Sequence, residues 1–166
     1  MIRLMTANDL DGVMIIQSSA YESPLHEDVR VFKNRIALFP EGCWVFEDNN
    51  EVGAYIFSHP SCQGKPPTLN DEIVLPEYPD CYYIHDLAVL GAYRGYGIGE
   101  NLINTIRNVA AGLKLFRFEL VAVQRSLKFW SKHGFAQVMN QQLESKLQTY
   151  SPDACYMVCE SEEGGG

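Results

Sequence analysis

One segment of the chain combines a strand pattern, a glycine-rich turn and a helix pattern in direct succession. Residues 82–90 are mainly aromatic and aliphatic around one polar pair, which favours a strand. Between residues 98 and 113 the apolar side chains recur at the helical period: Ile98, Leu102, Ile103, Ile106, Val109, Ala110 and Leu113. The turn between the two patterns is Arg94-Gly95-Tyr96-Gly97-Ile98-Gly99, and we expect the rest of the chain to fold around this unit.

The start of the predicted helix is suited to binding an anion. The first N–H groups of a helix have no partner within it, and the helix dipole places partial positive charge there. Glycines just ahead of the helix let the backbone approach a phosphate or pyrophosphate closely, and Arg94 adds a charged fork of donors. The Rossmann pattern would need a glycine where Glu100 stands, and no run matches the Walker loop.

The remaining elements follow from hydrophobic periodicity and turn residues. We predict strands at residues 2–5, 43–47, 52–59, 82–90, 115–123, 135–139 and 154–160, and helices at residues 10–20, 27–39, 98–113 and 125–133. Residues 60–80 carry five prolines and form a long loop, which in compact domains is usually functional or mobile. At this length we expect one domain over residues 1–162 and a frayed tail at residues 163–166.

The turn fits the pattern R-x-x-G-x-G at Arg94, Gly97 and Gly99. It resembles the acyl-CoA pyrophosphate loop of the GNAT superfamily of N-acetyltransferases. The predicted order β, α, α, β, β, β, α, β, α, β, β is also the order of that family. The resemblance implies an α/β fold, mixed in the α+β sense, in which a central, mostly antiparallel sheet carries helices on both faces.

A second block resembles the family's later strand–helix–strand unit, which ends in small-x-x-apolar-Tyr-x-x-x-Gly-Phe. Ser126 takes the small position, Phe129 takes the apolar one, and Gly134-Phe135 match directly. Trp130 stands where the family has a tyrosine that can protonate the departing CoA thiolate. An indole cannot act as an acid in that range, and a free CoA thiol titrates close enough to neutrality that water could protonate the thiolate. The asparagine that often begins this block is also missing, with Val123 or Gln124 near its place.

The resemblance implies an acyl-CoA-dependent N-acyltransferase that moves acetyl from acetyl-CoA to an amine of a small molecule or peptide, without a metal. It implies that Leu87, Ala88, Val89, Arg94, Gly95, Tyr96, Gly97, Ile98, Gly99, Ser126 and Phe129 bind the CoA substrate. A backbone N–H in residues 87–89 would polarise the acyl carbonyl. The histidines, His26, His59, His85 and His133, show no metal-site spacing.

The acceptor amine must lose a proton before it attacks. Alkyl amines titrate near 10, so deprotonation at neutral pH costs about 4 kcal/mol. His85 and Asp86 are the candidate bases, because both stand in mid-strand just before the carbonyl-polarising segment. Adjacent strand residues face opposite sides, so we expect at most one of them to reach the acceptor. Glu119 is a weaker candidate, expected at a half-buried sheet position.

Two other functions remain compatible with the motifs. One is a non-catalytic acyl-CoA sensor that kept the cofactor loop and lost the acid, and the other is a phosphate-binding scaffold unrelated to CoA. The acceptor itself is not specified, since its pocket would be built from loops at residues 21–27, 60–80 and 141–153. Assembly as a homodimer is left open.

The amino-acid composition limits the classes of partner and the cellular compartment that we expect for this protein. A net charge of −8 argues against non-specific nucleic-acid binding, and it fits a cationic acceptor and plain solubility equally well. Five cysteines without a C-x-x-C pair favour a reducing cytoplasm over a disulfide framework. We see no signal-peptide pattern and no apolar run of membrane-spanning length, so a cytoplasmic protein without membrane partners is expected.

Overall fold

The computed structural model describes residues 1–161, so the predicted tail at residues 163–166 lies outside the described part. Within residues 1–161, seven strands form one sheet in the order β1-β2-β3-β4-β5-β7-β6. The strands are β1 (Ile2–Leu4), β2 (Cys43–Asp48), β3 (Glu51–Ser61), β4 (Cys81–Val89), β5 (Arg117–Ala122), β6 (Ala136–Gln137) and β7 (Cys155–Glu160). The α-helices are α1 (Leu10–Ala20), α2 (Val29–Leu38), α3 (Ile98–Gly112), α4 (Leu127–Lys132) and α5 (Glu144–Tyr150).

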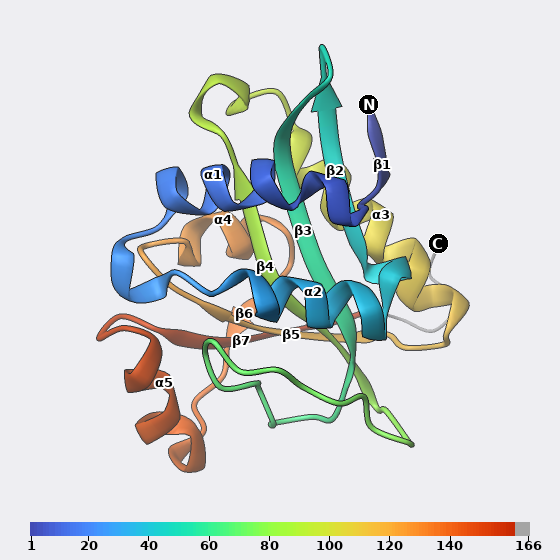
Figure 1. Ribbon diagram of the computed structural model, residues 1–166. Helices are drawn as coiled ribbons and strands as arrows, with labels where there is room; N and C mark the ends of the chain where they lie inside the picture. Colours follow the sequence, from blue (N-terminus) through green and yellow to red (C-terminus); the bar gives the residue numbers. More distant parts are fainter. Residues whose placement is uncertain (162–166) are drawn as a thin grey trace.

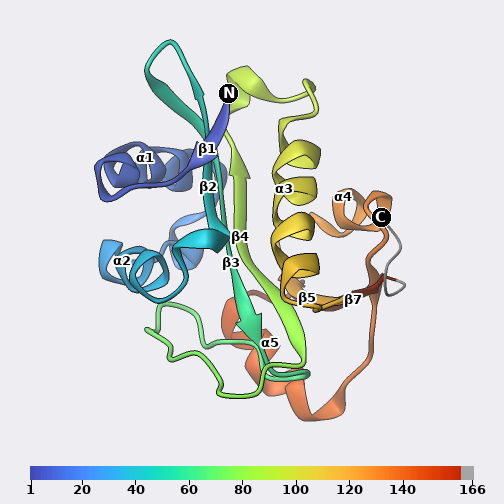
Figure 2. The same ribbon diagram turned by 90° about the vertical axis from the view of Figure 1, so that its right-hand side faces the viewer.

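The sheet is antiparallel except where β4 pairs with β5 in parallel. Helices α1 and α2 cover one face of the sheet, and α3 and α4 lie on the other (Figures 1 and 2). The predicted mixed, mostly antiparallel sheet with helices on both faces is therefore confirmed.

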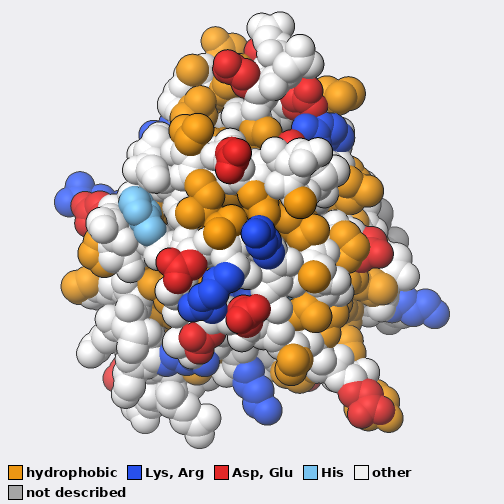
Figure 3. Space-filling view, in the orientation of Figure 1, with side chains coloured by type: hydrophobic (Ala, Val, Ile, Leu, Met, Phe, Trp, Pro, Cys, Tyr) orange, Lys and Arg blue, Asp and Glu red, His pale blue; other side chains and the backbone are white. Residues whose placement is uncertain are grey.

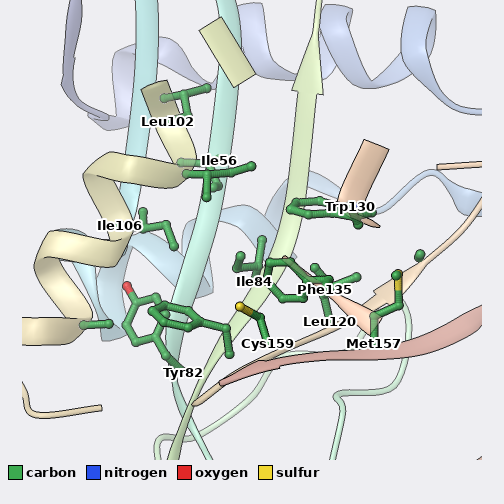
Figure 4. Packing of buried hydrophobic residues seen from close by; sticks show 14 of the residues in the cluster. Ile56, Tyr82, Ile84, Leu102, Ile106, Leu120, Trp130, Phe135, Met157 and Cys159 are labelled. Carbon is green, nitrogen blue, oxygen red and sulfur yellow. The ribbon is translucent and has the colours of Figure 1, made fainter. Parts of the chain in front are cut away.

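The larger core lies between the sheet and α3 (Figure 4). The helix buries the predicted apolar face, with Leu102 and Ile106 packed toward Ile56 of β3. Val109 is only partly buried, and Leu113 is 45 % exposed because it follows the last residue of the helix. Burial of this stripe, more than helix propensity, holds α3 against the sheet.

A second core lies between the sheet and helices α1 and α2. In it the Phe32 ring of α2 stacks on Phe57 of β3, with centroids 4.6 Å apart. On the outer surface of this side, acidic and basic side chains are interspersed with apolar ones (Figure 3). Among residues 1–161 no helix combines the length and the apolar character needed to cross a bilayer.

The segment between β6 and β7 differs from the prediction. Residues 141–153 were expected to form a loop, but they contain a 3-10 turn at Gln141–Leu143 followed by α5, and β6 is only two residues long. A helix of seven residues is too short to show a hydrophobic period. Its place is set by tertiary packing, because Leu143 and Leu147 contact Tyr156 and Val158 of β7.

Candidate active site

Strands β4 and β5 separate shortly after they meet. Their register has only two pairs, Tyr82 with Phe118 and Tyr83 with Glu119. Beyond these pairs the strands diverge, and a cavity of about 840 Å³ lies between them. Residues 84–89 of β4 line one side of it, and Leu120, Val121 and Val123 line the other. Main-chain groups of β4 that lack a β5 partner there are available to a ligand.

The glycine-rich turn at residues 94–99, here named the glycine turn, borders the same cavity. Gly97 precedes α3 with a φ of 75°, and Gly95 has a φ of 87°, so both adopt the left-handed region that favours glycine. A Cβ atom at either position would meet no atom within 4 Å, so the space in front of the helix start is open. The N–H of Asn101 bonds to the Gly97 carbonyl at 3.0 Å, which leaves the first N–H groups of α3 without helical partners.

Arg94 joins the turn to β4, since its Nε atom donates to the Val89 carbonyl at 3.3 Å. Most residues predicted to bind the CoA substrate line the cavity, namely Leu87, Ala88, Val89, Arg94, Gly95, Gly97, Ile98, Gly99, Ser126 and Phe129. Tyr96 is not among the lining residues and is 75 % exposed. The Phe129 ring limits the space beside Gly99, because a Cβ at this position would lie 3.3 Å from a ring carbon.

Trp130 belongs to both the cavity wall and the core. Its side chain is only 7 % exposed and packs edge-on against Phe135, with ring centroids 5.4 Å apart (Figure 4). Because Trp130 takes the position of the family tyrosine that faces the CoA sulfur, we predict that it packs against the pantetheine arm of the CoA substrate.

A register shift in β4 changes the expected orientation of His85 and Asp86. Phe57 of β3 pairs with Asp86, but the next residue, Ser58, pairs with Ile84, so His85 is an extra residue in β4. Both side chains consequently point to the α1–α2 side, where their hydrogen-bond partners lie. The expectation that these neighbours face opposite sides was wrong, because a bulge interrupts the alternation of a regular strand.

His85 is paired with a residue that the sequence interpretation missed. Its Nε2 atom lies 2.7 Å from Oε1 of Glu27, which precedes α2, and each side chain is 4 % exposed. Burial alone would raise the pKa of Glu27, but His85 and the N–H of Asn70 outweigh it and lower that pKa. Because the carboxylate is thus ionised at neutral pH, we assign the proton of neutral His85 to Nε2, which leaves Nδ1 as the accepting nitrogen.

Asp86 is held by two tyrosines. Its Oδ1 accepts a hydrogen bond from the Tyr21 hydroxyl and its Oδ2 from the Tyr55 hydroxyl, each at 2.8 Å. Burial raises the pKa of Asp86 to about 6; the Glu27 charge adds to this, and His85 and the two hydroxyls oppose it. With both oxygens engaged, Asp86 is suited to fixing Tyr21 against β4, and the Tyr21 hydroxyl also lies 2.9 Å from the Leu87 carbonyl.

Within the described part of the chain, Glu119 is not among the residues that line the cavity. It is 1 % exposed rather than half-buried, and it accepts hydrogen bonds from Arg117 at 2.8 Å and from the Gly64 N–H at 3.0 Å. These contacts tie β5 to the start of the long loop.

The end of the cavity opposite the glycine turn is enclosed by the three segments from which we expected the acceptor pocket. Leu25 comes from the connection between α1 and α2, Leu69 from the proline-bearing loop, and Tyr150 from the end of α5. The Tyr150 hydroxyl donates to the Pro67 carbonyl, which joins α5 to that loop. The cavity therefore runs from the open helix start at α3 to the His85–Glu27 pair and this enclosed end.

The family model described as "Acetyltransferase (GNAT) family" matches residues 10–135, which include the glycine turn, the bulged strand and α4. The chain belongs to the GNAT acetyltransferase family. No curated protein sequence matches it significantly.

Solved structures share this GNAT fold over almost the whole chain. Ard1 from Thermoplasma volcanium is 18 % identical, with 98 % of both chains covered and a TM-score of 0.75. Naa50 from Arabidopsis thaliana, in complex with the bisubstrate analogue CoA-Ac-MVNAL, is 20 % identical, with 98 % of both chains covered and a TM-score of 0.69. Rv2747 from Mycobacterium tuberculosis, in complex with CoA and NLQ, is 16 % identical, covers 98 % of this chain and 99 % of its own, and has a TM-score of 0.69.

Several polar residues of this GNAT domain were not found from the sequence. Tyr55 lies in β3, and Tyr21 and Glu27 lie in the connection between α1 and α2. Each of the three side chains reaches β4 only in the folded chain. A local signal existed for Tyr21 and Glu27 alone, because both stand in the segment 21–27 that we expected to help form the acceptor pocket.

Proposed function

We propose that this protein is an acyl-CoA-dependent N-acyltransferase that transfers acetyl from acetyl-CoA to an amine of a small molecule or peptide. One observation carries the proposal: a single cavity joins the open start of α3, the unpaired edge of β4 and the His85–Glu27 pair. The helix start would bind the pyrophosphate, the strand edge would donate hydrogen bonds to the acyl carbonyl, and the His85–Glu27 pair would act as the base. All three border one continuous space. Membership of the GNAT family supports acyl-CoA as the donor.

The glycine turn would hold acetyl-CoA by its pyrophosphate. The open space at Gly95 and Gly97 lets the anion approach the first N–H groups of α3, and Arg94 adds positive charge beside it. A side chain at Gly97 would occupy that space. The pantetheine arm would then run between β4 and β5, and a backbone N–H of residues 87–89 would stabilise the negative charge that develops on the acyl oxygen.

The amine would enter at the end lined by Leu69 and Tyr150 and attack the acyl carbon directly in a ternary complex. The new N–C bond forms and the thioester C–S bond breaks. The attacking nitrogen releases its second proton to water, and CoA leaves as a thiolate that takes a proton from water. His85, oriented by Glu27, would accept the ammonium proton on Nδ1, either directly or through a water molecule. This step supplies the neutral amine, which costs about 4 kcal/mol at neutral pH.

The test is a screen of purified protein with acetyl-CoA and a panel of small-molecule and peptide amines. Thiol release is recorded, and mass spectrometry identifies the acetylated product. Acetylation of at least one amine, lost in the His85→Ala variant, supports the proposal. Thermal stabilisation by CoA without turnover on any amine would instead favour the acyl-CoA sensor. Stabilisation by ATP but not by CoA would favour a phosphate-binding scaffold.

A further inference from the structure

The second oxygen of Glu27 is held by the loop between β3 and β4, residues 62–80, here named the proline loop. The backbone N–H of Asn70 donates to Oε2 at 2.8 Å, while Oε1 faces Nε2 of His85 at 2.7 Å. The carboxylate is therefore bound at both oxygens inside a nearly fully buried site. It cannot rotate away from His85 without losing the bond to the loop.

Asn70 is itself fastened to the residues that begin α2. Its Oδ1 accepts from the Asp28 N–H at 2.8 Å, its Nδ2 donates to Asp28 Oδ2 at 3.3 Å, and its carbonyl accepts from Arg30 Nη2 at 2.7 Å. Its φ of 64° lies in the left-handed region, which asparagine tolerates better than most residues. These contacts aim the Asn70 N–H at Glu27.

We propose that Asn70 is a positioning residue that acts through Glu27 to hold His85 in the orientation needed for proton removal. This inference rests on the proposed function, because it takes His85 as the base. Leu69, the neighbour of Asn70, lines the acceptor end of the cavity. An acceptor amine that contacts Leu69 therefore contacts the same loop segment that holds Glu27 and, through it, His85. Binding of the acceptor and alignment of the base are thus coupled.

The decisive experiment is a double-mutant cycle between Asn70→Gly and Glu27→Ala. Glycine keeps the backbone N–H and suits the positive φ, so only the side-chain anchors to Asp28 are lost. We expect Asn70→Gly to lower kcat about tenfold in the otherwise unchanged protein, with the KM for acetyl-CoA unaltered. In the Glu27→Ala background it should lower kcat no further, because the group through which it acts is absent.

Asn34→Ala is the matched control, because Asn34 holds the same loop at a different point. Its Oδ1 accepts from the Ile73 N–H at 2.9 Å and its Nδ2 donates to the Ile73 carbonyl at 3.2 Å. Any loss of kcat in this variant should be the same with and without Glu27. Equal losses for Asn70→Gly in both backgrounds would overturn the inference, because the loop would then act on general stability alone.

A second readout needs no activity. Against the effect of burial, His85, the Asn70 N–H and the charge of Arg35 together lower the pKa of Glu27. A lowered carboxyl pKa contributes stability at neutral pH that is lost as pH falls through it. Without the side-chain anchors to Asp28, the N–H of residue 70 is no longer held in line with Glu27. The stability deficit of Asn70→Gly in urea unfolding should therefore be largest near neutral pH and shrink in acid. A deficit independent of pH would contradict the inference. If His85→Ala left turnover intact, the proposed base would fail, and this measurement would still test the contact between Asn70 and Glu27.

Discussion

Oε1 of Glu27 lies 2.7 Å from Nε2 of His85, although 58 residues separate them along the chain. The contact joins the segment before α2 to the bulge of β4 at the acceptor end of the cavity. A buried carboxylate with a lowered pKa beside an imidazole fixes the orientation of the ring and the nitrogen that carries its proton. This arrangement suits a general base that must act repeatedly at neutral pH.

Removal of the base should have a pH-dependent effect. We expect His85→Ala to lower kcat/KM by about a hundredfold near neutral pH, the lower range for loss of a general base. The deficit should shrink as pH approaches the amine pKa near 10, where the acceptor is already neutral. Initial rates measured from pH 6 to pH 10 check this. Profiles of His85→Ala and the unaltered protein that run parallel at all pH values would place the base elsewhere.

Asp86 should affect stability with the opposite pH dependence to Glu27. Its pKa is raised from 3.8 to about 6, so between these values the folded protein binds more protons than the unfolded chain. The free energy of unfolding therefore falls as pH rises through this window. Asp86→Asn should gain stability relative to the unaltered protein by up to about 3 kcal/mol between pH 4 and pH 7, at about 1.4 kcal/mol per pKa unit.

Urea unfolding of both proteins at several pH values measures this difference. The acylation rate of Asp86→Asn should keep the pH profile of the unaltered protein, because both carboxylate oxygens of Asp86 serve Tyr21 and Tyr55. A stability difference that does not vary with pH would show that Asp86 titrates at its ordinary value.

Gly97→Val should remove binding of the CoA substrate. The new side chain would project into the open space before α3, and its positive φ would add about 1–3 kcal/mol of strain. Thermal shift with increasing CoA measures the loss. Gly91→Ala, in the 3-10 turn just before residues 94–99, is the control, because a Cβ there meets no atom within 4 Å and the residue does not have a positive φ. A folded Gly97→Val protein that still binds CoA with unchanged affinity would disprove the assignment of the loop.

A comparison of Trp130→Tyr with Trp130→Phe should show whether the chemistry needs an acid at this position. The two variants differ by one hydroxyl, and both keep an aromatic ring against Phe135. We expect equal kcat values, with a higher KM for acetyl-CoA in both, because packing lost equally in ground and transition states appears as weaker binding. Steady-state kinetics of the two variants measures both kcat and the KM for acetyl-CoA. A markedly faster Tyr variant with a new limb at basic pH would mean that a proton donor is wanted here.

Local patterns in the sequence determined the framework of the site. The left-handed conformations at Gly95 and Gly97 and the buried stripe of α3 follow from single residues and from a period of a few residues. Such features depend on backbone sterics and on one amphipathic face, so they can be read without knowing what packs against them. The same residues carried the resemblance to the GNAT family, and the family model confirms it.

The tertiary structure decided how the catalytic end is assembled. One extra residue in β4 turned His85 and Asp86 to the same face, and a bulge depends on pairing with β3 that the residues of β4 do not reveal. Glu27 reaches His85, and Asn70 reaches Glu27, from segments far apart in the chain. Helix α5 lies where Leu147 finds an apolar partner on β7. Contacts of this kind are set by long-range packing, which leaves no periodic trace in the sequence, whereas the cofactor turn is encoded within six consecutive residues.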